Sequence, residues 1–294
     1  MAEKTPEKPK TAGKAKAPGG KPDLTTCAGL ALAFGGILGG LLLEGGKLSD
    51  VSQLTAAMIV LGGTLGAVMV TTPVTVLLGA AKKLPLVFFE RAQNAEAVTE
   101  EILGYATKAR KSGIVSLEQD IERVQNPFLQ KALNLAIDGM DLSELRGMME
   151  LEISLEEQHG EEEAKVYEAA GGYSPTIGII GAVLGLIQVM KNLANIDEVG
   201  KGIAVAFVAT VYGVALANIF LLPAAAKIKS RLRRSIRMRE QILEGVVGIV
   251  EGLNPKLIRI KLEAYSREDA AQKTPKPAKE RVKQAAPQPA PVEK

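Results

Sequence analysis

The stretch "GGYSPTIGIIGAVLGLIQVM", residues 171–190, decides how the rest of the sequence is interpreted. It is long and apolar enough to cross a membrane as a helix, because a hydrocarbon core about 30 Å thick needs roughly 20 predominantly apolar residues. It contains no Asp, Glu, Lys or Arg, although Ser174, Pro175 and Thr176 stand near its start. The first prediction is therefore a membrane-spanning helix that carries polar groups but no ionisable one.

Three further runs share this character, and together they predict an all-α, polytopic membrane protein with four transmembrane helices. The predicted spans are Leu24–Leu43, Leu54–Ala81, Tyr173–Met190 and Gly202–Ala226, and none contains a charged residue. Four core helices of a soluble protein are the alternative. We disfavour it because such helices normally show a polar stripe.

The distribution of charge predicts how the spans are oriented. Residues 82–172 hold ten basic and eighteen acidic residues, whereas basic residues gather before the first span and after the second and fourth. The connections 44–53 and 191–201 carry few positive charges. By the positive-inside rule both termini and the 82–172 segment are cytoplasmic. A nucleic-acid patch is the weaker interpretation of the basic run after Ala226, because a run that directly follows a span is expected to contact membrane lipid.

These patterns divide the chain into six segments. They are a disordered cytoplasmic tail (1–23), a transmembrane hairpin (24–81), a helical cytoplasmic domain (82–172), a channel-lining transmembrane hairpin (173–226), a basic cytoplasmic helical segment (227–265) and a disordered tail (266–294). The tails are predicted to be disordered because their Lys-, Pro- and Ala-rich composition offers too little apolar surface to offset the entropy of ordering.

Local signals predict the helices of the cytoplasmic domain. Ser112-Gly113 is expected to end one helix, a capping box at Ser116 to begin the next, and Asn126-Pro127 to interrupt it. Asp141 is expected to cap a long helix that runs through the acidic stretch into the third span. In the first two spans, glycines four residues apart, such as Gly35 and Gly39 or Gly62 and Gly66, predict close packing against another helix.

Nothing in the sequence resembles an enzyme active site. It has no P-loop, dinucleotide fingerprint, HExxH or G-x-S-x-G motif. One histidine, His159, and one cysteine, Cys27, leave few candidates for nucleophilic or metal-assisted catalysis. We therefore expect no enzyme, no resident metal and no cofactor.

Polar residues inside the third and fourth spans are more informative, because a hydroxyl or amide in hydrocarbon usually faces protein or a water-lined cavity. They are Ser174, Thr176, Gln188, Thr210, Tyr212 and Asn218. Pro175 and Pro223 are expected near the cytoplasmic ends of their spans, where each bends or stops a helix. An ion path normally needs an acid or base within the membrane. These spans supply none, so we expect another polypeptide to provide it, which disfavours a self-contained secondary transporter.

Three segments resemble the MotA family of bacterial flagellar stator subunits, within the MotA/TolQ/ExbB proton channel superfamily. They are "IVLGGTLGA", "GGYSPTIGIIGAVLGLIQVMKNL" and "VGKGIAVAFVATVYGVALANIFLLPAAAKIK", and the resemblance runs from about Leu24 to Tyr265. It implies a protein of the bacterial inner membrane, driven by a transmembrane proton or sodium gradient rather than by a cofactor. Several copies would surround a dimer of MotB, a single-span partner that brings an aspartate to the channel. A TolQ- or ExbB-type energy transducer is the alternative, but those relatives have three spans.

The resemblance also implies roles for individual residues. Pro175 and Pro223 correspond to the prolines involved in coupling, and Thr210 corresponds to a threonine that lines the ion path. We assign Thr176 and Tyr212, polar residues of the same two spans, to the ion path and coupling as well. Sodium-driven relatives commonly have a threonine where this chain has Ala182 in "GAVLG". Because losing an oxygen ligand disfavours a bare cation more than a proton, protons are the expected ion.

A second motif implies contact with the flagellar rotor. In the family, charged residues of the cytoplasmic domain contact the rotor protein FliG, through a basic residue followed by Ser-Leu-Glu. Here the segment reads "KARKSGIVSLEQDIE", which places the basic residue at Arg110 and the glutamate at Glu118. Exposed ion pairs are individually weak, about 0–1 kcal/mol, which suits a contact that is made and broken repeatedly.

Overall fold

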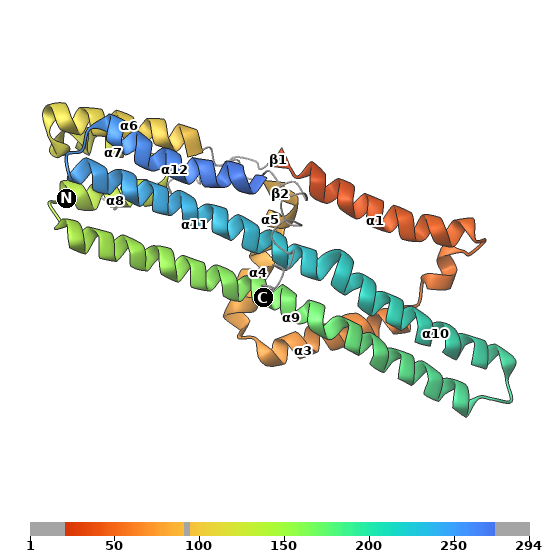
Figure 1. Cartoon of the computed structure of the whole chain (residues 1–294). Coiled ribbons are helices and arrows are strands. Elements are labelled where there is room, and N and C mark those ends of the chain that lie inside the picture. Colours follow the sequence, from red (N-terminus) through yellow and green to blue (C-terminus); the bar gives the residue numbers. More distant parts are fainter. Residues whose placement is uncertain (1–20, 91–94, 274–294) are drawn as a thin grey trace, which may run out of the picture.

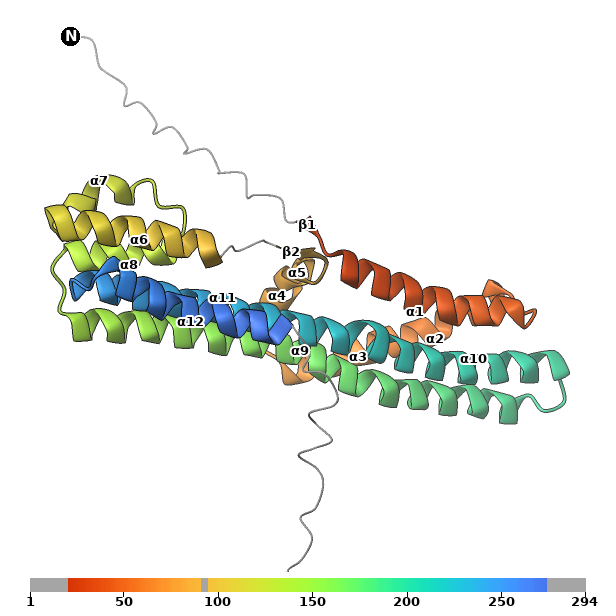
Figure 2. The ribbon, with the colours of Figure 1, turned by 45° about the horizontal axis from the view of Figure 1, so that its top comes forward.

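The structure is a computed structural model that describes residues 21–90 and 95–273 as an elongated, helical protein (Figure 1). Two long antiparallel rods run along its length: α9 (Leu142–Lys191) and the continuous α10 (Ile196–Ala215), η4 (Leu216–Leu221) and α11 (Leu222–Val250). The apolar helices gather at one end and the charged helices at the other (Figure 2). The remaining elements are β1 (Lys21–Pro22), α1 (Leu24–Leu43), η1 (Leu48–Val51), α2 (Leu54–Ala57), η2 (Met58–Gly62), α3 (Gly63–Thr71), α4 (Val74–Lys83), α5 (Pro85–Phe88), β2 (Phe89–Glu90), α6 (Ala95–Ser112), η3 (Ile114–Leu117), α7 (Glu118–Ile121), α8 (Pro127–Ile137) and α12 (Pro255–Lys273).

Four helical stretches are long and apolar enough to span a membrane, which confirms the predicted fold class. They are Leu24–Leu43, Leu48–Thr71, and apolar parts of Leu142–Lys191 and Ile196–Val250. Among the described residues the strands are limited to a two-residue antiparallel ladder between β1 and β2. The predicted tails, where they cover residues 1–20 and 274–294, lie outside the described residues.

The second span is shorter than the sequence suggested. A continuous helix over Leu54–Ala81 is wrong, because α3 ends at Thr71 and a separate helix, α4, begins at Val74. The cause is Pro73: a proline disfavours the helical conformation of the residue before it, and Thr72 is extended, with φ −128° and ψ 130°.

Close contact between the backbones of α9 and α10 holds the apolar half together. A line of buried small residues on α9 faces a similar line on α10 and η4; we call the two lines the small-residue seam. Its members are Gly171, Ser174, Gly178, Gly181 and Gly185 on α9, and Gly202, Ala206, Ala209, Gly213 and Ala217 opposite. A Cβ atom on Gly213 would lie 2.6 Å from the carbonyl oxygen of Ser174, and one on Gly185 would lie 2.7 Å from the backbone nitrogen of Ala206. Larger side chains would force the two helices apart.

The close packing predicted for the glycines of the first two spans is not found within the chain. A Cβ atom on Gly35, Gly39, Gly62 or Gly66 would meet no atom within 4 Å. For Gly35 and Gly39 the reason is that α1 stands apart from the rods (Figure 1) and none of its residues is buried. In the second span the neighbouring Gly63 faces α9 instead, where a Cβ atom would lie 2.7 Å from the side chain of Ile177. A four-residue glycine spacing permits close approach without requiring it.

The elements α6, η3, α7, α8 and α12 pack with the charged halves of α9 and α11; we call this group the charged bundle. Its fully buried side chains include Ile102, Leu117, Leu129, Leu133, Leu145, Met149, Ile242, Val246, Ile258 and Leu262. Because α9 and α11 run unbroken from this bundle into the apolar half, the predicted boundaries at 172/173 and 226/227 fall inside continuous helices. Likewise α12 extends to Lys273, past the predicted boundary at 265.

Most local signals in the charged bundle act as predicted. Gly113, with φ 80°, follows the end of α6. Asn126 and Asp141 cap α8 and α9 by accepting hydrogen bonds from backbone N–H groups. The predicted capping box at Ser116 is wrong, because Ser116 lies inside η3 and its hydroxyl donates to the carbonyl of Gly113.

We expect Gly213→Ala to destabilise the protein by about 1–3 kcal/mol, the usual cost of overpacking, because the new methyl group meets the backbone of α9. Gly200→Ala is the matched control. It lies in the same helix with no atom within 4 Å of its Cβ position, and the removal of a helical glycine favours folding by about 1 kcal/mol. Thermal unfolding in detergent, followed by circular dichroism, measures both. Equal changes in thermal stability of the two variants would contradict the close backbone contact between α9 and α10 at Gly213.

Candidate functional site

Pro175 lies inside α9, next to the seam, and the helix continues through it. Proline lacks an N–H, so the carbonyl of Gly171 loses its usual helical donor. The neighbouring hydroxyls are satisfied: Ser174, fully buried, donates to the carbonyl of Gly213 at 2.9 Å, and exposed Thr176 donates to the carbonyl of Tyr173 at 2.8 Å. The Ser174 bond ties α9 to α10 across the seam.

Two predicted residues of α10 lie close to this point. The Cα of Thr210 lies 3.4 Å from the position that a Cβ on Gly178 would occupy, and its hydroxyl donates to the carbonyl of Ala206 at 3.2 Å. The hydroxyl of Tyr212 donates to the carbonyl of Val51 and accepts from the N–H of Gln53. Tyr212 therefore fixes the start of the second span against α10.

Pro223 is separated from Pro175. It is exposed, near the start of α11, directly after the π-helical turn η4. Ser174, the residue before Pro175, lies beside Gly213. Gly213 precedes Pro223 by ten residues on that rod, which is about 15 Å at the helical rise. Pro223 lies toward the charged bundle and Pro175 deeper in the apolar half, so the two prolines act at different levels. Ala182, half-buried, follows Gly181 of the seam.

A groove between α1 and the α10–α11 rod brings Thr210 and Pro223 to one surface. It consists of two adjoining hollows of about 350 and 450 Å³ that share Asn218 and Ile219. Pro223 lines the first hollow, with Lys227, and Thr210 lines the second. Pro175, Thr176, Ala182 and Tyr212 do not line this groove.

One buried polar side chain of the apolar half has no hydrogen-bond partner among the described residues. Thr64 in α3 is 4% exposed, and its hydroxyl is unsatisfied. The residue stands in "IVLGGTLGA", but nothing in that segment singled it out. Between Leu54 and Thr71, and from Ala169 to Met190 and Gly202 to Ala226 on the two rods, the described residues include no acid or base.

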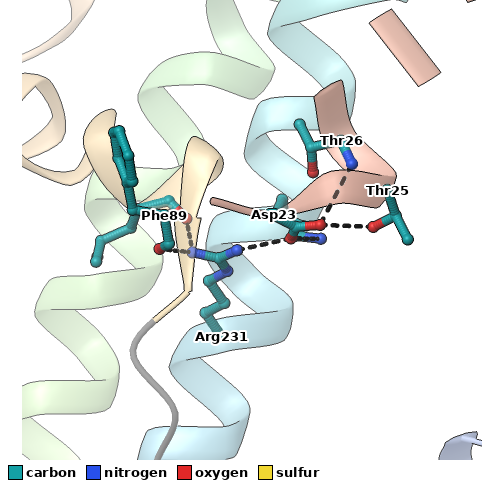
Figure 3. Close-up of polar contacts among 7 residues, drawn as sticks. Asp23, Thr25, Thr26, Phe89 and Arg231 are labelled. Carbon is teal, nitrogen blue, oxygen red and sulfur yellow. Dashed lines mark hydrogen bonds and ion pairs between the residues drawn. The ribbon is translucent and has the colours of Figure 1, made fainter. Parts of the chain in front are cut away.

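At the boundary between the apolar half and the charged bundle lies a cluster that the sequence analysis missed (Figure 3). Asp23, only 7% exposed, caps α1 by accepting from the N–H of Thr26. The same carboxylate pairs with Nζ of Lys227 at 2.5 Å and Nη2 of Arg231 at 2.8 Å. Arg231 also donates to the backbone carbonyls of Leu86 and Phe89. Two features of the sequence could have indicated it: Asp23 directly precedes the first apolar run, and two basic residues four positions apart, Lys227 and Arg231, follow the last one.

The pKa of the Asp23 carboxyl lies well below its usual range. The hydrogen bond from Lys227 is the largest cause and the one from Thr25 the next, while burial acts in the opposite direction. Because the pKa is lowered, the contribution of the carboxylate to stability is fully present above about pH 4 and declines only under more acidic conditions. Asp23 is therefore ionised at neutral pH.

The two predicted rotor-contact residues lie far from the spans, at one corner of the charged bundle. Arg110 is in the last turn of α6 and Glu118 begins α7, with the Gly113 turn and η3 between them. Both side chains are exposed, and neither has an ion-pair or hydrogen-bond partner in the described part of the chain. Nearby, Lys108 and Asp120 form an ion pair at 2.6 Å that joins α6 to α7, so the corner is braced.

Comparison with known proteins gives consistent results. The MotA/TolQ/ExbB proton channel family matches residues 120–241, and the motility protein A N-terminal family matches residues 27–112. Motility protein A of Bacillus subtilis is 34% identical over 89% of this chain and 93% of its own length. Chemotaxis protein PomA of Vibrio alginolyticus is 30% identical over 84% and 96%.

Solved structures agree with these relatives. The flagellar MotAB stator complex from Bacillus subtilis matches with a TM-score of 0.76 at 32% identity, over 89% of this chain and 100% of that chain. MotAB of C. jejuni matches with a TM-score of 0.79 at 32% identity, over 83% and 95%. The named relatives are motility proteins, so the alternative of a TolQ- or ExbB-type transducer is not favoured. The chain therefore belongs to the MotA/TolQ/ExbB proton channel family, as a flagellar stator subunit.

Proposed function

We propose that several copies of this chain surround a MotB-type dimer and complete with it an ion path that drives the flagellar rotor. The observation that carries the proposal is the composition of the apolar half: residues 24–43, 54–71, 169–190 and 202–226 carry hydroxyl groups and two prolines but hold no Asp, Glu, Lys or Arg. An aspartate from a single-span partner supplies the missing acid. The structures of MotAB complexes, which match most of this chain, support such a partner.

The ion path in this proposal involves Pro175, Thr176, Ala182, Thr210 and Tyr212, with Pro223 coupling its state to the cytoplasmic side. Thr210 lies against the seam beside Gly178 and also lines the groove, so a change at the seam reaches the groove through it. Pro223 lies on the same groove, at the entrance to α11, which continues into the charged bundle. Protonation of the partner acid would act on the first five residues, and α11 would carry the change onward.

In this proposal the protein lies in the bacterial inner membrane, with the charged bundle and both termini in the cytoplasm. The basic residues that follow the second and fourth spans support this orientation through the positive-inside rule. These residues, among them Lys82, Lys83 and Arg233, are also suited to contact anionic lipid headgroups. The exposed, unpaired charges of Arg110 and Glu118 support a contact with the rotor protein FliG. We propose no catalytic activity and no cofactor, the energy coming from the ion gradient.

We expect proton-driven rotation. In a strain where this chain and its partner form the sole stator, swimming speed should be insensitive to sodium concentration and abolished by a protonophore. The physical reason is Ala182, whose methyl group offers no oxygen ligand to a bare cation. Speed that rises with sodium at constant proton gradient would contradict the assignment, and the variant Ala182→Thr would then show whether this position matters.

We expect charge reversal at the corner of the charged bundle to reduce motility strongly. Arg110→Glu and Glu118→Lys each replace an attraction to the rotor by a repulsion, without disturbing an internal ion pair. Swimming rate in soft agar and the amount of protein in the membrane are the measurements. Lys256→Glu, at an exposed site at the start of α12, is the control and should swim normally. Normal swimming of both corner variants would exclude this contact surface.

A further inference from the structure

The first span is attached to the remainder of the chain near its ends. None of the residues of α1 is buried, and the groove separates it from α10. Its N-terminal end packs against α5 and carries the Asp23 cluster. At its far end the chain is held where Tyr212 bonds Val51 and Gln53, just before α2. The position of α1 is therefore set by these polar contacts more than by packing.

The contacts at the N-terminal end converge on one short part of α11. Lys227 and Arg231 stand four and eight residues after Pro223, that is one and about two turns into the helix. Both bind one carboxylate, that of Asp23, while the Arg231 guanidinium also bonds the carbonyls of Leu86 and Phe89. The N–H of Asp23 donates to the carbonyl of Phe88 at 2.8 Å, and β1 pairs with β2. Four segments, α1, α5, β2 and the start of α11, are thus joined at one point (Figure 3).

The rod is weakest directly before this point. Residues Leu216–Leu221 form a π-helix, and Pro223 cannot donate a backbone hydrogen bond. Wide turns and prolines of this kind are the places where long helices bend. By contrast, the buried Asp23 carboxylate, held by two cations, the Thr25 hydroxyl and the Thr26 N–H, resists displacement, because separating it leaves a desolvated charge without a partner.

We propose that Asp23 is a positioning residue for torque generation: with Lys227 and Arg231 it clamps the start of α11 to α1 and α5, so that bending at η4 and Pro223 moves them as one block. This inference rests on the proposed coupling role of Pro223. In the clamped protein a bend before Pro223 is transmitted to α11 and onward to the charged bundle. Without the clamp, α11 shifts against α1 and part of the movement is lost, although the ion path along the seam is intact.

Asp23→Asn separates the clamp from the helix cap, because asparagine caps helices as well as aspartate does but carries no charge. The test uses the full chain co-expressed with its partner in a strain without other stators. Three quantities are measured: complex in the membrane, proton uptake by vesicles that contain the complex, and torque of tethered cells. We expect complex and proton uptake within about twofold of the parent, and torque lowered about fivefold, a size typical of lost coupling between linked sites.

Glu168→Gln is the matched control. It removes the ion pair between Glu168 and Nζ of Lys229, which lies only two residues from Lys227 on α11. The two groups are 2.7 Å apart, but unlike Asp23 this pair is exposed to solvent. Its torque should equal that of the parent, because exposed pairs contribute little. Lys227→Arg, which keeps the charge, should retain torque, whereas Lys227→Gln should lose part of it. If Asp23→Asn does not accumulate in the membrane, the torque of the two Lys227 variants tests the clamp instead, and equal torque in both would reject it.

Two results would overturn the proposal: unchanged torque in Asp23→Asn, or torque and proton uptake that fall in proportion, which indicates a purely structural role. Pro223→Ala tests the underlying function separately. A loss of torque in Pro223→Ala but not in Asp23→Asn rejects the clamp and keeps the coupling role. The opposite pattern rejects the coupling role of Pro223 and therefore overturns the inference that rests on it.

Discussion

The contact between two backbones along the small-residue seam is the constraint on which the rest of the structure depends. A membrane offers helices no hydrophobic driving force for association, so close van der Waals packing and hydrogen bonds must supply it. Glycine and alanine on both faces allow this, and the bond from Ser174 to the carbonyl of Gly213 adds a polar link. Because a methyl group at several of these positions would collide with the opposite backbone, α9 and α10 act as one rigid pair.

This rigidity determines where movement can occur. The seam fixes Pro175, Thr210 and their neighbours in relation to each other, while α1 stands outside it without a buried residue. One irregular turn, η4, lies at the end of the seam, to which it contributes Ala217, and comes shortly before Pro223. The other, η2, lies in the second span, which packs against both rods. Asp23 holds the start of the first span to Lys227 and Arg231, which follow η4 along the rod. Tyr212, which precedes η4, holds the start of the second span. The two sets of polar contacts thus lie on opposite sides of the irregular turn.

Composition and periodicity predicted the four spans, the long α9 helix, the helix break at Asn126-Pro127 and the cap at Asp141, because these depend on local chemistry. The break at Thr72-Pro73 was also local, but its apolar surroundings hid it. The seam was overlooked although Gly171, Gly178 and Gly185 recur every seven residues, since a glycine pattern alone does not identify its partner. The Asp23 cluster joins residues about two hundred positions apart, and no single-sequence signal pairs them. Site residues inferred from resemblance were placed correctly on helices, but their separation into two levels needed the fold.

The energy available per ion limits what this arrangement can do. One elementary charge crossing 100 mV supplies about 2.3 kcal/mol, which is comparable with two ordinary hydrogen bonds. Separating the seam would expose many close contacts at once and exceeds that energy. A small rotation at η4, where the helical hydrogen-bond pattern is already irregular, does not. In the proposed coupling, the long, unbroken α11 would convert a small angular change near Pro223 into a larger displacement at the far end of the charged bundle, where Arg110 and Glu118 lie. The small residues thus account for the close-packed seam, Pro223 for the irregular start of α11, and the charged continuation of α11 for its reach into the charged bundle.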